Sequence, residues 1–519
     1  MPQHEAATLD AADREAISAH GLTVSEIERQ AALLRGPQSF RRLDRTASPG
    51  DGVIQLTEAQ VTDCLETFAE AAAHGRFLSF VPASGAASRM FKSLVATLAA
   101  GGDLSRATLR ASNDPDAQDT LRVCDERDSF AFADELRRYF TSRGDNLDSI
   151  ADDDDCAPLL HALLDGDALA SPERAKGLLD FHLYRDTTRT AFEEHLEEAA
   201  SLLRADDGRV ALHFTVSPQH EQAFAATLER ARGPIEERHI ATLDIAFSTQ
   251  SPATDTIALD DTGALFRDDG GRLLFRPGGH GSLIHNLEGT AGDLVFIKNI
   301  DNIVPDDRRE PVLRWRRTLG GFLVHLLNRT AELAARLNAN PDDADAAGET
   351  RVFLANDLGL VDDTEVDPRR ALERVLGRPM RVCGVVRNTG DPGGGPFWVQ
   401  RNGEAVSRQI VETAEIDTSD AAQAALLGSA THFNPTDMVC ALRGQDGQAF
   451  DLDSFVDRDA VFMAEKSHGG RTLRALEHPG LWNGSMADWT TVFVEAPREI
   501  FQPVKSVLDL LGPGHRPAA

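Results

Sequence analysis

Lysine is scarce in this sequence. Only five of its 53 basic residues are lysines (Lys92, Lys176, Lys298, Lys466 and Lys505), whereas 83 residues are acidic and the formal net charge is -30. This charge disfavours binding to nucleic acid or to an anionic membrane, since both are negatively charged. An acidic, lysine-poor surface suits a high-salt cytoplasm, so we expect a halophilic protein. The remaining lysines are therefore expected to be enriched at positions where an ammonium group is required.

Paired cysteines, long apolar runs and a secretory signal are also missing. The five cysteines are scattered and no two form a CxxC pair, which predicts buried reduced thiols rather than disulfides or a zinc site. No stretch approaches the roughly 20 apolar residues that span a bilayer, and the N-terminus is polar and acidic. We therefore expect a cytoplasmic protein that binds neither nucleic acid nor a membrane.

Strands alternate with helices along the middle of the chain. Apolar, β-prone runs occur at 77–81, 210–216, 240–249 and 293–302, with helical patterns between them. This alternation predicts an α/β fold with a mainly parallel sheet. We expect a helical N-terminal extension over 1–75, an α/β domain over 76–465 with a helical insertion at about 94–174, and a C-terminal segment over 466–519 that packs on this domain.

The stretch 77–92, FLSFVPASGAASRMFK, reads as a strand, a turn of small residues and a helix. Small residues let backbone N–H groups approach a phosphate at a helix N-terminus. Arg89 adds a positively charged guanidinium group that can donate two parallel hydrogen bonds. The turn contains neither the GxxxxGK[ST] of a Walker loop nor the GxGxxG of a dinucleotide site. An ordinary strand-to-helix connection remains the alternative.

Two later motifs carry further polar groups. RPGGHGSL at 276–283 is a second glycine-rich turn that opens a helix, and DLVFIKNIDN at 293–302 ends a strand with Lys298, Asn299 and Asp301. Ligands of open α/β sheets lie at such C-terminal strand ends. The acidic run Asp152–Asp155 is expected to be a solvated loop rather than a metal site.

In this order the motifs resemble those of the sugar-nucleotide pyrophosphorylases. SGAASRM at 84–90 and KGLLDFH at 176–182 resemble the two halves GxGxR(M/L) and PKxLLPI, here separated by the helical insertion. GGHG at 278–281 is similar to the PPGHG-type turn of the UDP-sugar branch, and FIKNIDN to its VxNxDN strand. The whole chain also resembles a bacterial family known only as a domain of unknown function.

The resemblance implies a GT-A-like nucleotidyltransferase fold, in which helices sandwich a mixed, mainly parallel sheet. It also implies an enzyme that joins a nucleoside triphosphate to a sugar 1-phosphate with release of pyrophosphate, using Mg²⁺. The chain departs from the signature where Ser84 or Ala83 replaces a glycine, and where Ala175 and Asp180 replace prolines. These departures make the expected position of the nucleotide less certain to follow the family, but the cationic residues of the signature are all present.

The resemblance assigns a role to each candidate residue. Arg89 and Lys176 are the candidate catalytic residues, and Asp301 is the candidate Mg²⁺ ligand. The candidate nucleotide-binding residues are Ala83, Ser84, Gly85, Ala86, Gln250, Gly278, Gly279, His280 and Gly281. The candidates on the sugar-phosphate side are Lys298, Glu412, Asn434 and Lys466. We expect His280 to shape its turn rather than to transfer protons, because the reaction needs no strong base.

Two other functions remain open. The altered signature positions favour a catalytically silent protein that binds nucleotide or sugar phosphate with the same fold. A glycosyltransferase would use a DxD pair for its metal, and Asp451 and Asp453 are the only late pair of this kind that we single out. The base, the sugar, a second metal ligand and the oligomeric state are not predicted.

Overall fold

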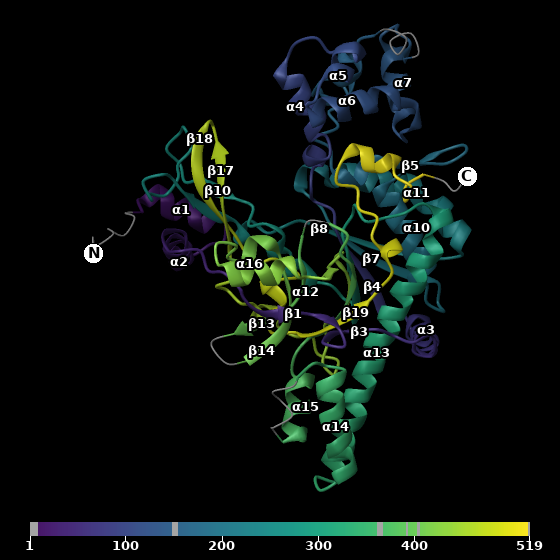
Figure 1. The fold of residues 1–519 in the computed structure, drawn as a ribbon, viewed down its shortest axis with the longest axis vertical. Coiled ribbons are helices and arrows are strands. Elements are labelled where there is room, and N and C mark those ends of the chain that lie inside the picture. Colours follow the sequence, from purple (N-terminus) through teal and green to yellow (C-terminus); the bar gives the residue numbers. More distant parts are fainter. Residues whose placement is uncertain (1–8, 148–153, 361–366, 391–392, 402–404, 517–519) are drawn as a thin grey trace. The chain divides into compact units, whose positions relative to one another are not determined.

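The computed structural model describes residues 9–147, 154–360, 367–390, 393–401 and 405–516 (Figure 1). The chain divides into two compact units, and each unit combines three separate stretches of sequence. Unit 1 comprises Met1–Thr67, Gln250–Val295 and Leu319–Ala496. Unit 2 comprises Phe68–Thr249, Phe296–Thr318 and Pro497–Ala519.

Unit 2 is built on parallel strands. The order is β11-β4-β7-β8, in which β7 pairs parallel with both β4 and β8. These strands are β4 (Phe77–Pro82), β7 (Arg209–Thr215), β8 (Thr242–Ser248) and β11 (Leu294–Lys298), and a hairpin adds β5 (Asp180–Leu183) and β6 (Thr188–Thr190). Helices α10 (Ala191–Leu203) and α11 (Glu221–His239) pack on each other, and α11 makes the crossover from β7 to β8. The four strands predicted from apolar runs are confirmed.

The insertion predicted at about 94–174 is helical. Its described helices are α4 (Lys92–Ala100), α5 (Arg106–Ala111), α6 (Pro115–Asp125), α7 (Ala133–Ser142) and α9 (Ala157–Leu164). Several begin at residues suited to cap a helix: the Asp114 side chain accepts from the Asp116 N–H, and Pro115 occupies the first turn of α6. All five cysteines of the chain are buried free thiols, as predicted.

Unit 1 contains three sheets. Their strand orders are β2-β3-β19-β12-β16, β10-β9-β18-β17 and β1-β13-β14, and β15 pairs with β12. In the first sheet β19 pairs parallel with β3 and β12, whereas β16 is antiparallel to β12. The strands are β1 (Arg42–Thr46), β2 (Ser48–Pro49), β3 (Gly52–Ile54), β9 (Thr256–Leu259), β10 (Phe275–Arg276), β12 (Met380–Arg387), β13 (Gly395–Arg401), β14 (Ala405–Val411), β15 (His432–Phe433), β16 (Asp437–Ala441), β17 (Phe462–His468), β18 (Arg471–Glu477) and β19 (Thr490–Glu495).

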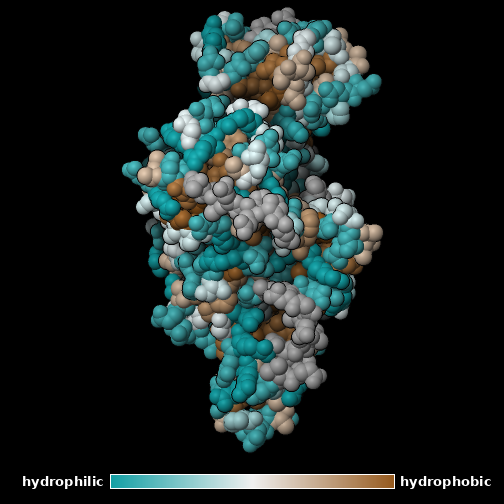
Figure 2. All heavy atoms as spheres, turned by 90° about the vertical axis from the view of Figure 1, so that its left-hand side faces the viewer, coloured by the Kyte–Doolittle hydropathy of each residue, from teal (hydrophilic) through white to brown (hydrophobic). Residues whose placement is uncertain are grey.

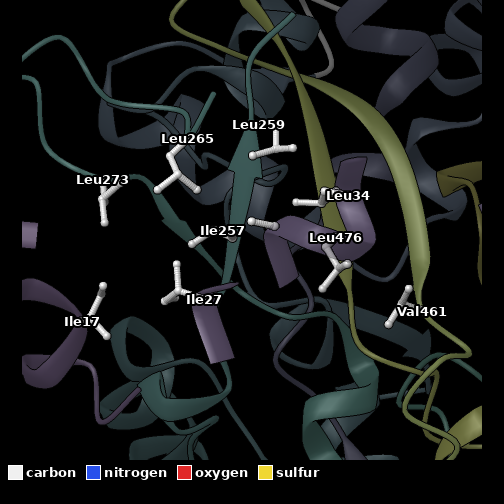
Figure 3. Close-up of a cluster of buried hydrophobic side chains, with 10 residues drawn as sticks. Ile17, Ile27, Leu34, Ile257, Leu259, Leu265, Leu273, Val461 and Leu476 are labelled. Carbon is white, nitrogen blue, oxygen red and sulfur yellow. The ribbon is translucent and has the colours of Figure 1, made fainter. Parts of the chain in front are cut away.

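The first two helices of the chain pack on the sheet that contains β9 and β18. Ile17 of α1 (Ala11–Ala19) and Ile27 and Leu34 of α2 (Val24–Arg35) gather with Ile257 and Leu476 in one buried cluster (Figure 3). The other helices that lie in unit 1 or extend into it are α3 (Glu58–Ala73), α12 (Ile284–Glu288), α13 (Arg309–Ala339), α14 (Ala344–Asn356), α15 (Pro368–Leu376) and α16 (Ala421–Gly428). Apolar contacts thus fix the helical N-terminal region to its sheet.

The face drawn in Figure 2 is covered mainly by hydrophilic residues, with small hydrophobic areas scattered among them. Within the described part of the chain, no helix combines the length and the apolar character needed to cross a membrane. The predicted α/β fold with mostly parallel pairing is confirmed. The GT-A-like arrangement stays a prediction.

Candidate functional site

The small-residue turn after β4 and the segment that begins at Lys176 lie side by side in unit 2. The backbone N–H of Lys176 donates to the carbonyl oxygen of Gly85 (3.0 Å), and the N–H of Ala87 donates to that of Arg174 (3.0 Å). Ala86 and Ala175 form a β-bridge between the two segments. The two halves of the expected signature, which the insertion separates in sequence, therefore meet in space.

The turn itself is open on one side. Ala83 is buried and its N–H donates to the carbonyl of Thr215 (2.8 Å), which fixes the turn to the neighbouring strand β7. Gly85 and Ala86 are exposed, and a Cβ added at Gly85 would meet no atom within 4 Å. A polyphosphate can therefore approach the backbone here without a steric clash. Ser84 is half-buried beside them.

Asp301 and two lysines form the centre of the candidate site. The Lys176 ammonium donates to Asp301 Oδ2 (2.7 Å) and to the carbonyl oxygen of Val504. Lys505, which follows Val504 in the C-terminal segment, donates to the same Oδ2 (3.1 Å). Asp301 Oδ1 is buried, and no group of the described chain forms a hydrogen bond with it. We call Lys176, Asp301 and Lys505 the lysine–aspartate cluster.

The charges in this cluster shift each other's pKa. Burial lowers the pKa of Lys176, and repulsion from Lys505 and Arg89 acts in the same direction, against the attraction of Asp301. Burial alone would raise the pKa of Asp301, but Lys505 and Lys176 hold it below its usual range. Arg89 is exposed at the end of the turn. Two ammonium groups therefore face one carboxylate, and Arg89 acts on Lys176 from nearby, which leaves a positive potential suited to an anionic ligand.

Lys298, predicted on the sugar-phosphate side, lies in a different environment. Its ammonium is fully buried and donates to both carboxylate oxygens of Glu198 (3.0 and 2.8 Å). Arg316 donates to the same carboxylate (2.6 Å). This buried ion-pair cluster fixes β11 to α10. We therefore infer a structural role for Lys298.

In unit 1 the second glycine turn packs against the segment EHPGLWNG at 477–484. The N–H of His478 donates to the carbonyl oxygen of Gly278 (2.8 Å), and Gly279 has a φ of +78°. A Cβ on Gly278 would lie 2.4 Å from the His478 ring, and one on Gly281 would lie 2.1 Å from the Pro479 carbonyl oxygen. Glycine is required here because two backbones approach each other closely.

Candidate residues from distant positions gather around this turn. The His280 ring stacks on Trp482 at 4.2 Å between centroids, and its Nδ1 accepts from the Leu481 N–H (3.1 Å). The Trp482 indole donates to Glu412 (3.2 Å). Burial lowers the pKa of His280, although Glu412 and Glu477 favour its protonation. The ring thus packs against the segment that faces its turn, and its expected role in shaping the turn stays a prediction.

Three further candidates are placed as follows. Lys466 donates to Glu477 (3.3 Å), whose carboxylate lies beside Gly279. Asn434 is buried, and its side-chain oxygen accepts from the Thr436 N–H (3.2 Å), an interaction that stabilises its own turn. Gln250 is half-buried two residues after the end of β8.

The chain was compared with protein families and with known proteins. A family model described as "Domain of unknown function (DUF4301)" matches residues 10–516. The chain belongs to this family. The resemblance found in the sequence is thereby confirmed, and no match is found among curated proteins.

Solved structures of UDP-sugar enzymes are similar to the chain. The uridine diphosphate N-acetylglucosamine pyrophosphorylase of Trypanosoma brucei shares 12% identity over 90% of this chain and 72% of its own, with a TM-score of 0.46. The UDP-glucose pyrophosphorylase of Leishmania major shares 12% identity over 97% of this chain and 79% of its own, with a TM-score of 0.43. These similarities carry no conclusion about activity, which is argued below from the residues.

Asp301 is the one carboxylate of the lysine–aspartate cluster that could bind Mg²⁺. This ion prefers oxygen ligands and is commonly held by one or two carboxylates together with substrate phosphates. Asp301 Oδ1 is a buried carboxylate oxygen without a hydrogen bond, so it is available as a ligand. Around Asp301, as in the rest of the described ranges, no group of three His, Cys, Asp or Glu side chains is arranged to hold a metal. Within the acidic run Asp152–Asp155, the first two residues lie outside those ranges.

The DxD pair already has local partners. Asp451 accepts from the Ser454 hydroxyl (2.6 Å), and Asp453 forms an ion pair with Arg458. Both residues belong to a turn and a short 3-10 helix in unit 1. These contacts account for both carboxylates without a metal.

Lys505 is the member of the lysine–aspartate cluster that the motif analysis missed. It lies in a PVKS stretch that resembles none of the motifs used, 204 positions after its partner Asp301. One signal was present, because Lys505 is one of only five lysines in a chain where arginine is the usual cation. The scarcity argument applied to it as much as to Lys176.

Proposed function

We propose that the chain is a nucleotidyltransferase that joins a nucleoside triphosphate to a sugar 1-phosphate and releases pyrophosphate. The observation that carries the proposal is the lysine–aspartate cluster beside the open, small-residue turn of unit 2. A triphosphate needs close backbone approach and several cations, and both are present there.

The reaction requires positioned charge rather than a covalent nucleophile. A phosphate oxygen of the sugar 1-phosphate attacks the α-phosphorus, the new P–O bond forms, and the bond to the β-phosphate oxygen breaks, so that pyrophosphate leaves with the electron pair. Lys176 would neutralise charge that develops on the α-phosphate, and Arg89 would bind the leaving phosphates. Lys505 would supply a second ammonium group on the same carboxylate.

Asp301 has two tasks in this proposal. Through Oδ2 it orients Lys176 and Lys505, and through Oδ1 it would hold Mg²⁺. When bound, Mg²⁺ would neutralise phosphate charge. The resemblance assigns base recognition to Gly278–Gly281 and Gln250, and sugar recognition to Glu412 and Lys466. His280 and Glu412 both contact Trp482, and Lys466 contacts Glu477 beside the same glycine turn, which supports a shared role for these three side chains.

The test is pyrophosphate release in Mg²⁺ and molar KCl, with each common nucleoside triphosphate paired with a panel of sugar 1-phosphates. Release is expected to need one particular pair of substrates and to fall by at least about 100-fold in Lys176→Ala, the usual loss when one electrostatic contact to a transition state is removed. Arg110→Ala is the control, since Arg110 is an exposed cation on α5, outside both the turn and the cluster. Unchanged melting temperatures would show that both variants remain folded.

Other outcomes would decide against the enzyme. If no pair reacts but a triphosphate raises the melting temperature, the chain is a binding protein. If no triphosphate changes the melting temperature, the nucleotide hypothesis itself fails. Chelation of the metal with EDTA is expected to abolish release, and full activity in EDTA would contradict the role given to Asp301 Oδ1.

A further inference from the structure

A cavity lies within unit 2, and no member of the lysine–aspartate cluster lines it. It encloses about 750 Å³ and is lined by α7, the β5–β6 hairpin, α10 and α11. Cavities of 300–1,000 Å³ are typical of sites for small molecules. None of the candidate residues chosen from the sequence lines it, although Ala175, next to Lys176, does. We call it the α7–α11 cavity.

Most charged side chains around the α7–α11 cavity already have a partner of opposite sign. Arg174 donates to both carboxylate oxygens of Glu135 (2.9 Å each). Arg189 donates to Asp306 (2.8 Å), and Arg238 to Glu197. These pairs build the wall and are not available to a ligand without being broken.

Three charged groups of the wall differ from these pairs. Arg138 on α7 is exposed, and no hydrogen bond or ion pair joins it to another side chain of the described residues. Arg230 on α11 has its nearest carboxylate, Glu193, at 3.9 Å. Asp180 on β5 is half-buried, and within the described ranges it has no ion pair. Burial and repulsion from Glu135 raise the pKa of Asp180 to about 6, against the opposing effects of a hydrogen bond to Thr188 and the charge of Arg174.

The cavity also offers neutral acceptors. Pro234 lies inside α11 and has no N–H, so the carbonyl oxygen of Arg230 lacks its helical donor, and both residues line the cavity. Thr188 and Thr190 of β6 also line the cavity, but the Thr188 hydroxyl bonds to Asp180 and the Thr190 hydroxyl caps α10 through Glu193. The site thus combines two accessible guanidinium groups with two acceptors for ligand hydroxyls, the Arg230 carbonyl oxygen and Asp180.

We propose that the α7–α11 cavity binds a small polyhydroxylated anion, such as a phosphorylated sugar or a sugar acid, with its anionic group at Arg138 and Arg230 and a hydroxyl group on Asp180. Guanidinium groups bind phosphate and carboxylate through paired N–H donors. A carboxyl group without a cation partner is well suited to a ligand hydroxyl, which brings a donor without adding charge. This site is independent of the proposed nucleotidyltransferase activity.

The experiment is calorimetric titration of the full chain with glucose 6-phosphate and gluconate, with sorbitol and inorganic phosphate as partial probes. At least one of the two sugar anions is expected to bind with a Kd of about 1 mM or tighter, and more tightly than either partial probe. Arg138→Gln combined with Arg230→Gln is expected to weaken this binding at least about tenfold, the equivalent of 1.4 kcal/mol. Arg110→Gln is the matched control, since Arg110 is an exposed arginine of the same insertion outside the cavity.

Two further variants separate the parts of the proposal. Asp180→Asn imitates the neutral carboxyl group, so the variant should fold. It is expected to weaken binding of the sugar anion but not binding of inorganic phosphate. Lys176→Ala should leave binding unchanged, because Lys176 lies outside the cavity. Binding that is lost in Lys176→Ala but kept in the double arginine variant would place the ligand at the candidate active site and overturn the proposal. Absence of binding by both sugar anions at about 1 mM would also overturn it.

Discussion

Replacement of Asp301 by asparagine tests the lysine–aspartate cluster without any assumption about activity. Asparagine keeps the shape of the side chain but removes the charge that faces Lys176 at 2.7 Å and Lys505 at 3.1 Å. At an effective dielectric constant near 20, the first of these contacts is worth about 6 kcal/mol of Coulomb energy before desolvation is subtracted. The second is worth less than about 1 kcal/mol, because Lys505 is 63% exposed and water screens its charge.

The net cost follows from what remains after the substitution. Removal of one partner from a buried ion pair typically costs 3–5 kcal/mol, because the other charge stays buried without compensation. Lys176 keeps its hydrogen bond to the Val504 carbonyl, so we expect the low end of this range, about 3 kcal/mol. Urea unfolding at pH 7 measures the free energy of unfolding, and Asp186→Asn, at an exposed position of the β5–β6 turn, is the control.

A second substitution makes the test specific to the pair. In the Asp301→Asn background, Lys176→Met removes the uncompensated ammonium group and is expected to recover part of the lost stability, whereas in the native background it is expected to destabilise. If Asp301→Asn stays within about 0.5 kcal/mol of the native chain, the value usual for surface changes, the cluster does not exist as described.

Three other substitutions test separate features. Ile240→Gly is expected to raise the free energy of unfolding in urea by about 0.5–1 kcal/mol, because Ile240 has a φ of +48° that strains a β-branched residue; a loss of stability would contradict this. Gly281→Ala should cost at least about 2 kcal/mol in the same assay, through overlap with the Pro479 carbonyl, whereas Gly348→Ala, in an open helical position, should not destabilise. Burial raises the pKa of Glu415 to about 7, so its contribution to stability is present below the unfolded pKa near 4.5 and lost as the pH rises to 7. The free energy of unfolding of Glu415→Gln, relative to that of the native chain, should therefore rise by up to about 3 kcal/mol between pH 4.5 and pH 8. A difference between the two proteins that does not change with pH would refute the reasoning.

The local elements could be predicted because each depends on its own residues. β4 is buried from Phe77 to Val81, and apolar, β-prone residues over such a length form a strand in almost any context. The pairing of distant segments is a different matter. The two short strands β3 and β19 pair in parallel although they lie near opposite ends of the chain. Nothing in their own composition specifies that partner, so the interleaving of the two units could not be predicted.

The same distinction applies to the candidate site. The meeting of the SGAASRM turn with Lys176 was predicted, because a known order of motifs linked the two segments. The contact between Lys505 and Asp301 depends on the path of the C-terminal segment, which no motif specified. The clustering of Lys466, Glu477 and His280 around one glycine turn likewise depends on the pairing of β17 with β18.

The scarcity of lysine is informative, but it does not distinguish a lysine that has a structural role from one that binds a ligand. Lys298 and Lys176 both stand in motifs, yet Lys298 is 1% exposed and locked between β11 and α10 by Glu198. Lys176 shares a single carboxylate with Lys505, beside an open turn. Each carboxylate carries two cations, because Arg316 also donates to Glu198, but Glu198, Lys298 and Arg316 are all 1% exposed whereas Lys505 is 63% exposed. The exposure of the cations on each carboxylate, rather than the rarity of lysine, therefore separates the candidate catalytic lysine from the structural one, because a ligand can reach only the exposed set.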